Sequence, residues 1–161
     1  MDGRSDPAAP VIRPVVESDL PVLYRHQRDP EACRMAAFPP RDEPAFMAHW
    51  ARILGRPEVT AWAVLTDDGA VAGNVVAFEL DGTPLVGYWI GREHWGHGLA
   101  TRALAALLQE LRRRPLYAHV ARHNAGSIRV LEKCGFVTVE ARTVTDEALG
   151  EVIEELVMKL A

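Results

Sequence analysis

Hydrophobic residues recur along the chain with two spacings, which separate strands from helices. Short apolar or alternating runs, bounded by turn residues, predict strands over 11–15, 60–66, 71–80, 85–91, 116–121, 136–143 and 151–160. Longer patterns with a helical repeat predict helices from Asp19 through Tyr24 and over 43–54, 98–114 and 124–134. The predicted order of elements is therefore β-α-α-β-β-β-α-β-α-β-β.

Turn residues indicate how these elements connect. Asp67-Asp68-Gly69 and Asp81-Gly82 are typical of hairpin turns, so the strands that they join form an antiparallel meander. The strand, helix and strand over 85–121 predict a parallel pair with a right-handed crossover. We therefore expect an α/β fold with a mixed, mostly antiparallel twisted sheet of six to seven strands, flanked by about four helices.

The positions of prolines indicate an edge strand and a loop, and the length of the chain indicates the number of domains. Pro14 places the first strand at an edge of the sheet. A loop-rich stretch is expected around Pro30, Pro39 and Pro40. The 161 residues suit one domain of ordinary size, which we expect over 11–161 after a flexible, polar tail over 1–10.

Charge and cysteine content exclude several classes of protein. A net charge of -4 argues against a nucleic-acid partner. The basic run Arg112-Arg113-Arg114 is better interpreted as the C-terminal end of a helix, where positive charge suits the helix dipole. Cys33 and Cys134 form no CxxC pair, which indicates neither a disulfide framework nor a zinc site. No run approaches a membrane span of about 20 apolar residues, so we expect a soluble cytoplasmic protein.

The most informative segment runs over 87–104, where a strand ends, a glycine-rich turn follows and a helix begins. The N-terminus of a helix offers unpaired N–H groups that bind phosphate, and Gly96 and Gly98 allow a close approach. A Walker loop would need Gly-Lys-Ser/Thr, which is missing here. A dinucleotide fingerprint would need a small residue in place of Thr101. An ordinary glycine turn into a core helix stays open as the alternative.

This segment resembles the pyrophosphate loop of the GNAT superfamily of N-acetyltransferases. The family pattern Gln/Arg-x-x-Gly-x-Gly/Ala is matched by the run from Trp95 to Ala100, with Trp95 in place of Gln/Arg. A second block from Asn124 to Phe136 is also similar to the family. The flanking residues resemble the branch of ribosomal-protein serine/alanine (Rim-type) N-acetyltransferases. The resemblance extends over essentially the whole chain from residue 11.

The resemblance implies that acetyl-CoA is the cosubstrate and that it enters where two central parallel strands splay apart. Loop N–H groups would hold its pyrophosphate, and a backbone N–H near Ile90 would stabilise the oxyanion of the transition state. The implied cofactor-binding residues are Trp89, Ile90, Trp95, Gly96, His97, Gly98, Leu99, Ala100, Thr101, Asn124 and Ser127.

Two proton transfers need catalytic residues. His119, on the strand beside the cofactor cleft, is the candidate base, because imidazole suits base chemistry near neutral pH. Many members of the family use a tyrosine as the acid where this chain has Leu131. The resemblance suggests Ser127 instead, with Tyr88 as a weaker candidate. A hydrogen-bonded strand histidine, a serine that binds helix backbone and a packed tyrosine are the structural alternatives.

The sequence therefore predicts an acetyl-CoA-dependent N-acetyltransferase in which the amine attacks the thioester directly. The best acceptor is the N-terminal α-amine of a protein or peptide, because its pKa of about 7.7–8.0 requires less help from a base than the lysine value of about 10.4. A small amine acceptor, a non-catalytic acyl-CoA-binding module and a nucleotide binder stay open, as does a homodimer.

Two further groups of side chains bear on metal binding and on the edge of the sheet. The histidine pairs 94 and 97 and 119 and 123 lack a carboxylate pattern, so no metal is predicted. A solvated edge is expected for the acidic residues Asp146, Glu147, Glu151, Glu154 and Glu155.

Overall fold

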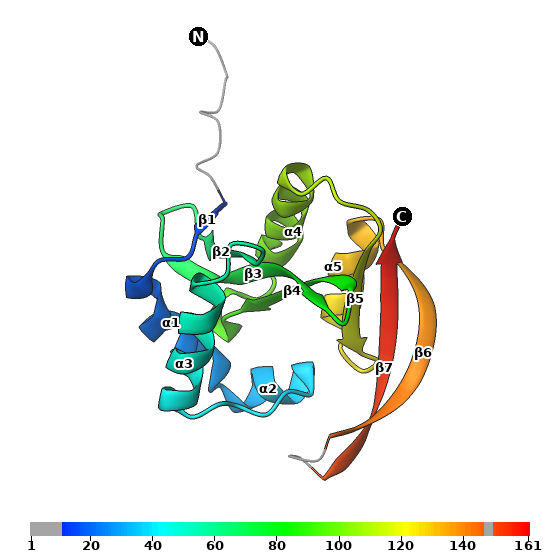
Figure 1. The fold of residues 1–161 in the computed structure, drawn as a ribbon. Coiled ribbons are helices and arrows are strands. Elements are labelled where there is room, and N and C mark those ends of the chain that lie inside the picture. Colours follow the sequence, from blue (N-terminus) through cyan, green and yellow to red (C-terminus); the bar gives the residue numbers. More distant parts are fainter. Residues whose placement is uncertain (1–10, 147–149) are drawn as a thin grey trace.

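A seven-stranded mixed sheet is the centre of the structure, a computed structural model that describes residues 11–146 and 150–161 (Figure 1). The predicted tail, residues 1–10, lies outside the described residues. The strand order is β1-β2-β3-β4-β5-β7-β6, and only the pair β4–β5 is parallel. The strands are β1 Ile12–Pro14, β2 Thr60–Leu65, β3 Val71–Leu80, β4 Thr83–Ile90, β5 Leu116–Ala121, β6 Val137–Asp146 and β7 Glu151–Leu160.

Helices cover both faces of this sheet (Figure 1). Neighbouring side chains on a strand point to opposite faces, and β2 shows the result: Val64 belongs to one core and Ala63 to the other. One core packs α4 and α5 against the sheet, and the other packs α1 and α3. The helices are α1 Leu20–Gln27, α2 Pro30–Ala36, α3 Glu43–Leu54, α4 Leu99–Glu110 and α5 Ala125–Lys133, with short 3-10 turns at Glu17–Asp19 and Arg92–His94.

The predicted α/β fold is confirmed, including the antiparallel meander of β2, β3 and β4 and the edge position of β1 with its Pro14. The parallel pair is short, because β4 and β5 are joined in register only at Leu85 and Tyr117. Beyond this point the strands splay apart toward Ile90 and Ala121, as the resemblance implied. The gap is therefore built into the middle of the sheet.

Two helical predictions were wrong in detail. Within the described residues there are five α-helices instead of about four, because 30–36 forms a helix and not a loop. Asp29 caps this helix by accepting a hydrogen bond from the Ala32 N–H at 2.9 Å, and Pro30 occupies its first turn, where proline is tolerated. The sequence carried both signals, but the proline was interpreted as a loop residue.

The glycine-loop helix α4 begins at Leu99 and ends at Glu110, whereas the prediction extended it to Arg114. The backbone of Leu111 is already extended. The Arg114 guanidinium donates hydrogen bonds to the carbonyls of Leu108 and Leu111 at 3.3 and 2.7 Å. The basic run therefore follows the helix and caps its last carbonyls from outside.

Asp19 is the N-cap residue of α1, as predicted, but its side chain makes no capping hydrogen bond to this helix. Asp19 is buried, and its carboxylate accepts two hydrogen bonds from Arg13 at 2.7 and 2.9 Å and one from the Val16 N–H at 2.9 Å. These interactions, with Arg13 as the largest cause, lower the pKa of Asp19. Asp19 thus links β1 to the turn before α1.

We expect Gly73 on β3 to tolerate no side chain. A Cβ atom there would lie 2.1 Å from the Trp89 carbonyl oxygen, because β4 crosses very close to β3 at this point. Gly73→Ala should therefore lower the free energy of unfolding by about 2 kcal/mol or more, measured by urea denaturation. Gly87→Ala is the matched control, since its Cβ would meet only the Val76 side chain at 3.6 Å. Equal stability of the two variants would contradict this account of the β3–β4 contact.

Candidate active site

The turn between β4 and α4 has the geometry of a phosphate-binding loop. Gly96 and Gly98 have φ angles of +80° and +73°, in the left-handed region that favours glycine. Gly98 is the N-cap residue of α4, and the first hydrogen bond of the helix runs from Arg102 N to the Gly98 carbonyl at 3.0 Å. The N–H groups from Gly98 to Thr101 therefore have no partner within the helix and suit the pyrophosphate of acetyl-CoA.

Trp95 connects this loop to the end of β4. Its indole N–H donates a hydrogen bond of 2.9 Å to the Ile90 carbonyl. The next residue, Gly91, donates its N–H to Ala72 on β3 at 2.8 Å. Because backbone groups alternate sides along a strand, the N–H and carbonyl of Ile90 point away from β3, toward the gap beside β5. This is the direction that the predicted oxyanion contact of Ile90 requires.

At the N-terminus of α5, Ser127, the predicted acid, contacts Tyr88, the weaker candidate for the same role. The Ser127 hydroxyl lies 2.6 Å from the Tyr88 hydroxyl, which also donates to the Ser127 carbonyl at 3.0 Å. The Asn124 side chain caps α5 by accepting a hydrogen bond from the Ser127 N–H at 3.2 Å. Burial raises the pKa of Tyr88 to about 12, so its phenol stays protonated at neutral pH. Leu131 is buried in the core, as expected for a residue that takes no part in proton transfer.

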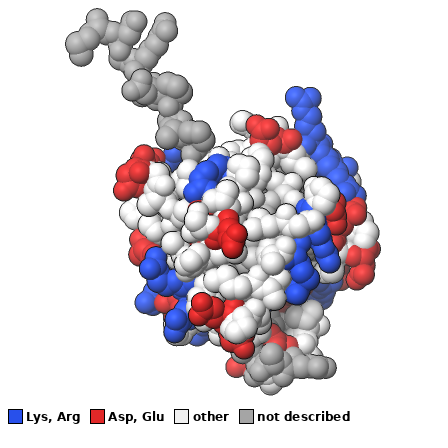
Figure 2. Space-filling view, turned by 60° about the vertical axis from the view of Figure 1, so that its left-hand side comes forward, with Lys and Arg blue, Asp and Glu red and all other residues white. Residues whose placement is uncertain are grey.

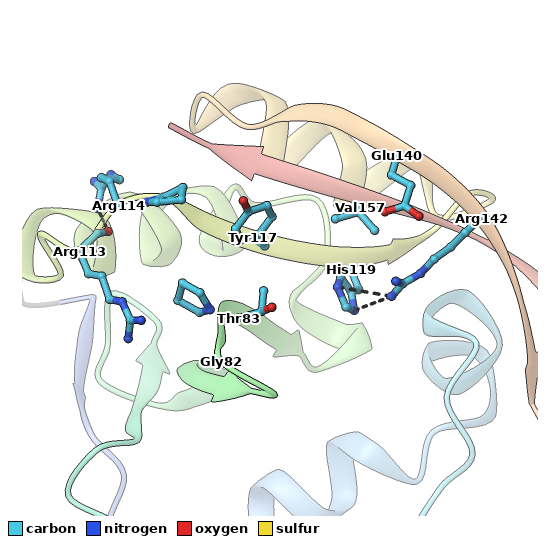
Figure 3. A pocket seen from close by; sticks show the side chains of 11 residues that line it. Gly82, Thr83, Arg113, Arg114, Tyr117, His119, Glu140, Arg142 and Val157 are labelled. Atoms are coloured by element: carbon cyan, nitrogen blue, oxygen red, sulfur yellow. Dashed lines mark hydrogen bonds between the residues drawn. The ribbon is translucent and has the colours of Figure 1, made fainter.

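His119 lies on the other face of β5, in a cluster with two charged residues. The Arg142 guanidinium lies 3.3 Å from Nδ1 of His119 (Figure 3). Glu155 accepts a hydrogen bond from Arg142 at 2.7 Å. The same Glu155 oxygen lies 3.8 Å from Nδ1 of His119. Because a guanidinium can only donate, a ring nitrogen of His119 that bonds to Arg142 acts as the acceptor.

Two pockets meet at His119. The first, of about 600 Å³, lies along the beginning of β4 and β5 (Figure 3). The second, of about 460 Å³, opens between the end of α2 and the strands β5, β6 and β7. Phe38, in its wall, packs edge-on against Trp89 with the ring centroids 6.0 Å apart, which places this pocket beside the end of β4. The second pocket is lined by Ala36, Ala37, Phe38, His119, Ala121, Val144, Thr145, Asp146, Ile153 and Glu155.

Two of the residues predicted to bind cofactor have side chains engaged elsewhere. The Leu99 side chain is buried in the core. The Trp89 indole donates to the His26 carbonyl at 3.2 Å. Leu99 can therefore meet a cosubstrate only through its backbone groups, and the indole N–H of Trp89 is not available to donate to one.

The thiols of Cys33 and Cys134 donate to backbone carbonyls, and burial raises the pKa of both. A raised pKa leaves less of each thiol in the nucleophilic thiolate form. Neither cysteine lines either pocket. This agrees with direct attack by the amine.

Helix α2 with Phe38 and the side chain of Glu155, which line the second pocket, were not predicted from the sequence, and neither was Arg142, which lines the first pocket. Glu155 was expected on a solvated edge, but it is half-buried and paired with Arg142. Asp146 also lines the second pocket. Glu151 and Glu154 are exposed as expected, and Glu147 lies outside the described residues. The sequence held no signal for this cluster, because β6 and β7 meet β5 only in the folded sheet.

On the face shown in Figure 2 acidic and basic side chains are interspersed and leave no broad area of a single sign. Among the described residues, no helix is both long enough and apolar enough to cross a membrane.

Comparison with known proteins identifies the class of this site. A family model described as acetyltransferase (GNAT) domain matches residues 11–137. The chain therefore belongs to the GNAT family of acetyltransferases, which use acetyl-CoA as the acyl donor. Comparison with curated proteins gives no match.

Solved structures share this fold at low sequence identity. Spermidine N-acetyltransferase from Vibrio cholerae, in complex with CoA and spermine, has a TM-score of 0.80 at 18% identity, with 92% of this chain and 93% of that chain covered. A phosphinothricin acetyltransferase from Sinorhizobium meliloti, in complex with acetyl-CoA, gives 0.78 at 19% identity, with coverage of 92% and 86%. The aminoglycoside acetyltransferase AAC(6')-Ib, in complex with coenzyme A, gives 0.74 at 19% identity, with coverage of 94% of each chain.

The hydroxyl pair of Ser127 and Tyr88 generates a testable prediction. If it supplies a proton to the leaving thiolate, Ser127→Ala and Tyr88→Phe should each lower kcat by about tenfold to a hundredfold with little change in KM for acetyl-CoA. The measurement is thiol release in steady state, with Tyr24→Phe as the control because Tyr24 packs against Phe46 away from this pair. Unchanged kcat in both variants would leave the pair a purely structural contact.

Proposed function

We propose that this GNAT enzyme acetylates a primary amine bound in the second pocket, with His119 as the base, and that the preferred acceptor is the N-terminal α-amine of a protein or peptide. The observation that carries this proposal is the position of His119. It lies at the wall of a pocket that reaches the splayed ends of β4 and β5, where the resemblance places the thioester.

The proposed roles follow from the two faces of the sheet. On one face, the unpaired N–H groups at the start of α4 hold the pyrophosphate, and the Ile90 N–H faces the gap. On the other face, His119 accepts a proton from the attacking ammonium, directly or through water. The main contribution of the protein is to bring amine and thioester together across the gap in the sheet.

The chemistry of the pocket supports a cationic acceptor. Asp146 and Glu155 lie in its wall and favour a protonated amine over a neutral or anionic ligand. An imidazole is a weak base, which suits an α-amine better than a lysine side chain. The resemblance to the ribosomal-protein branch supports the same choice.

A small polyamine or an amine-bearing antibiotic is the second candidate acceptor. Two carboxylates in one pocket suit a ligand with more than one positive charge. The structural neighbours named above include enzymes for spermidine and for aminoglycosides. A cytoplasmic location is also proposed, since Cys33 and Cys134 are both free thiols, as a reducing compartment allows.

A panel of amines tests the acceptor class. We expect thiol release from acetyl-CoA with peptides that begin with serine or alanine, and at least about tenfold lower kcat/KM with free amino acids, spermidine and an aminoglycoside. The same peptides with a blocked N-terminus are the matched control and should be inactive. Preferred turnover of spermidine or the aminoglycoside would move the assignment to the second candidate. If no amine of the panel gave thiol release although calorimetry showed tight binding of acetyl-CoA, the proposed activity would be contradicted.

The role of His119 has its own test. His119→Gln keeps a polar side chain but removes the base, so we expect kcat to fall by about a hundredfold while the Kd for CoA stays the same. The loss should shrink at high pH, where more of the amine is already deprotonated. His49→Gln on α3 is the matched histidine control. A pH profile of kcat identical to that of the unmodified enzyme would remove His119 from the mechanism.

A further inference from the structure

The most unusual buried group in the described part of the chain is His26, near the end of α1. Its side chain is only 2% exposed, yet neither Nδ1 nor Nε2 has a hydrogen-bond partner among the described residues. A buried polar group without a partner costs about 1–3 kcal/mol, so such a group calls for an explanation. The mechanism proposed above does not use this ring.

Two further side chains with metal-ligating atoms lie next to His26. Glu93 and His94 belong to the short turn between β4 and α4, and the Glu93 Oε1 atom lies 3.6 Å from Nε2 of His26 and 3.7 Å from Nε2 of His94. All three ligand atoms lie within 4.8 Å of one another. Tetrahedral coordination at about 2.0–2.1 Å from the metal places two ligand atoms about 3.4 Å apart. The present distances are therefore close to those of a metal site, while 3.6 Å is too long for a direct hydrogen bond.

The position of the His26 ring depends on Gly91. A Cβ atom on Gly91 would lie 2.6 Å from Nε2 of His26, so any residue larger than glycine would clash with the ring. The rings of His26 and His94 meet nearly at right angles, with their centroids 6.1 Å apart. Two imidazoles from separate elements are thus brought to one carboxylate.

From this geometry we propose that His26, Glu93 and His94 form a binding site for a divalent transition-metal ion, with Zn²⁺ the best match. Two imidazoles and one carboxylate are a ligand set that zinc accepts, and a water molecule would complete the coordination. The ion would join the end of α1 to the turn that leads into the phosphate loop. None of its three ligands is among the residues proposed for proton transfer.

The electrostatics of the site support moderate affinity. Burial is the largest cause that lowers the pKa of His26, which keeps the imidazole neutral, the form that binds a metal. The negative charge of Glu93 attracts a cation, and the nearby positive charge of Arg25 opposes it. We therefore expect weaker binding at this partly exposed site than at a fully buried structural zinc site.

Calorimetric titration of the full chain with ZnCl₂ tests the site directly. We expect one Zn²⁺ per chain and a rise in Tm when the ion is present, because a ligand that binds only the folded state stabilises it. Glu93→Gln and His94→Gln should each weaken binding by at least about tenfold, since each loses a ligand. Both residues lie at least partly at the surface, so these variants should fold, whereas replacement of the buried His26 would disturb the core.

His49→Gln is the matched control and should bind zinc like the unmodified chain, because His49 lies on α3 outside the cluster. Zinc binding that persists in both Glu93→Gln and His94→Gln would place the ion elsewhere and overturn the proposal. Failure of the unmodified chain to bind zinc would overturn it as well. Neither result depends on acetyltransferase activity.

Discussion

The separation of β4 from β5 is the constraint on which the rest of the site depends. Two parallel neighbours that share a single pair in register leave backbone groups on both inner edges without strand partners. Such groups are costly to bury unless a ligand or water pairs with them. A cosubstrate with amide groups is therefore a suitable occupant, and the loop at the start of α4 lies at the end of the same strand to hold its phosphates.

The continuous sheet on either side makes this gap stable. β3 and β4 are paired over eight residue pairs without a register shift, and β5 pairs with β7 along its whole length. Gly73 is part of this arrangement, since its missing side chain lets β4 approach β3 closely just where β4 leaves β5. Because both flanking ladders are complete, the splay is confined to one pair of strands.

The candidates for proton transfer lie on the two faces of the sheet. The Tyr88 and Ser127 hydroxyls lie on the side of α4 and α5. His119, Arg142 and Glu155 lie on the opposite side, where His119 and Glu155 line the pocket at the end of α2. The proposed base and the proposed proton donor would therefore act from opposite faces.

The sequence by itself determined the elements and the phosphate loop, because both depend on neighbours along the chain. Hydrophobic spacing, hairpin turns and the glycines at 96 and 98 are local signals, and they predicted the sheet, the crossover and the anion-binding turn. The helix at 30–36 was missed because a proline at a helix start has the same local appearance as a proline in a loop.

Only the tertiary structure decided which side chains meet. Glu155 and Arg142 reach His119 through the pairing of β5, β6 and β7, and Tyr88 reaches Ser127 across the sheet. His26 likewise meets Glu93 and His94 only because α1 packs against the end of β4. Contacts between residues so distant along the chain depend on how the elements pack. The local periodicity of a single sequence carries no information about that packing.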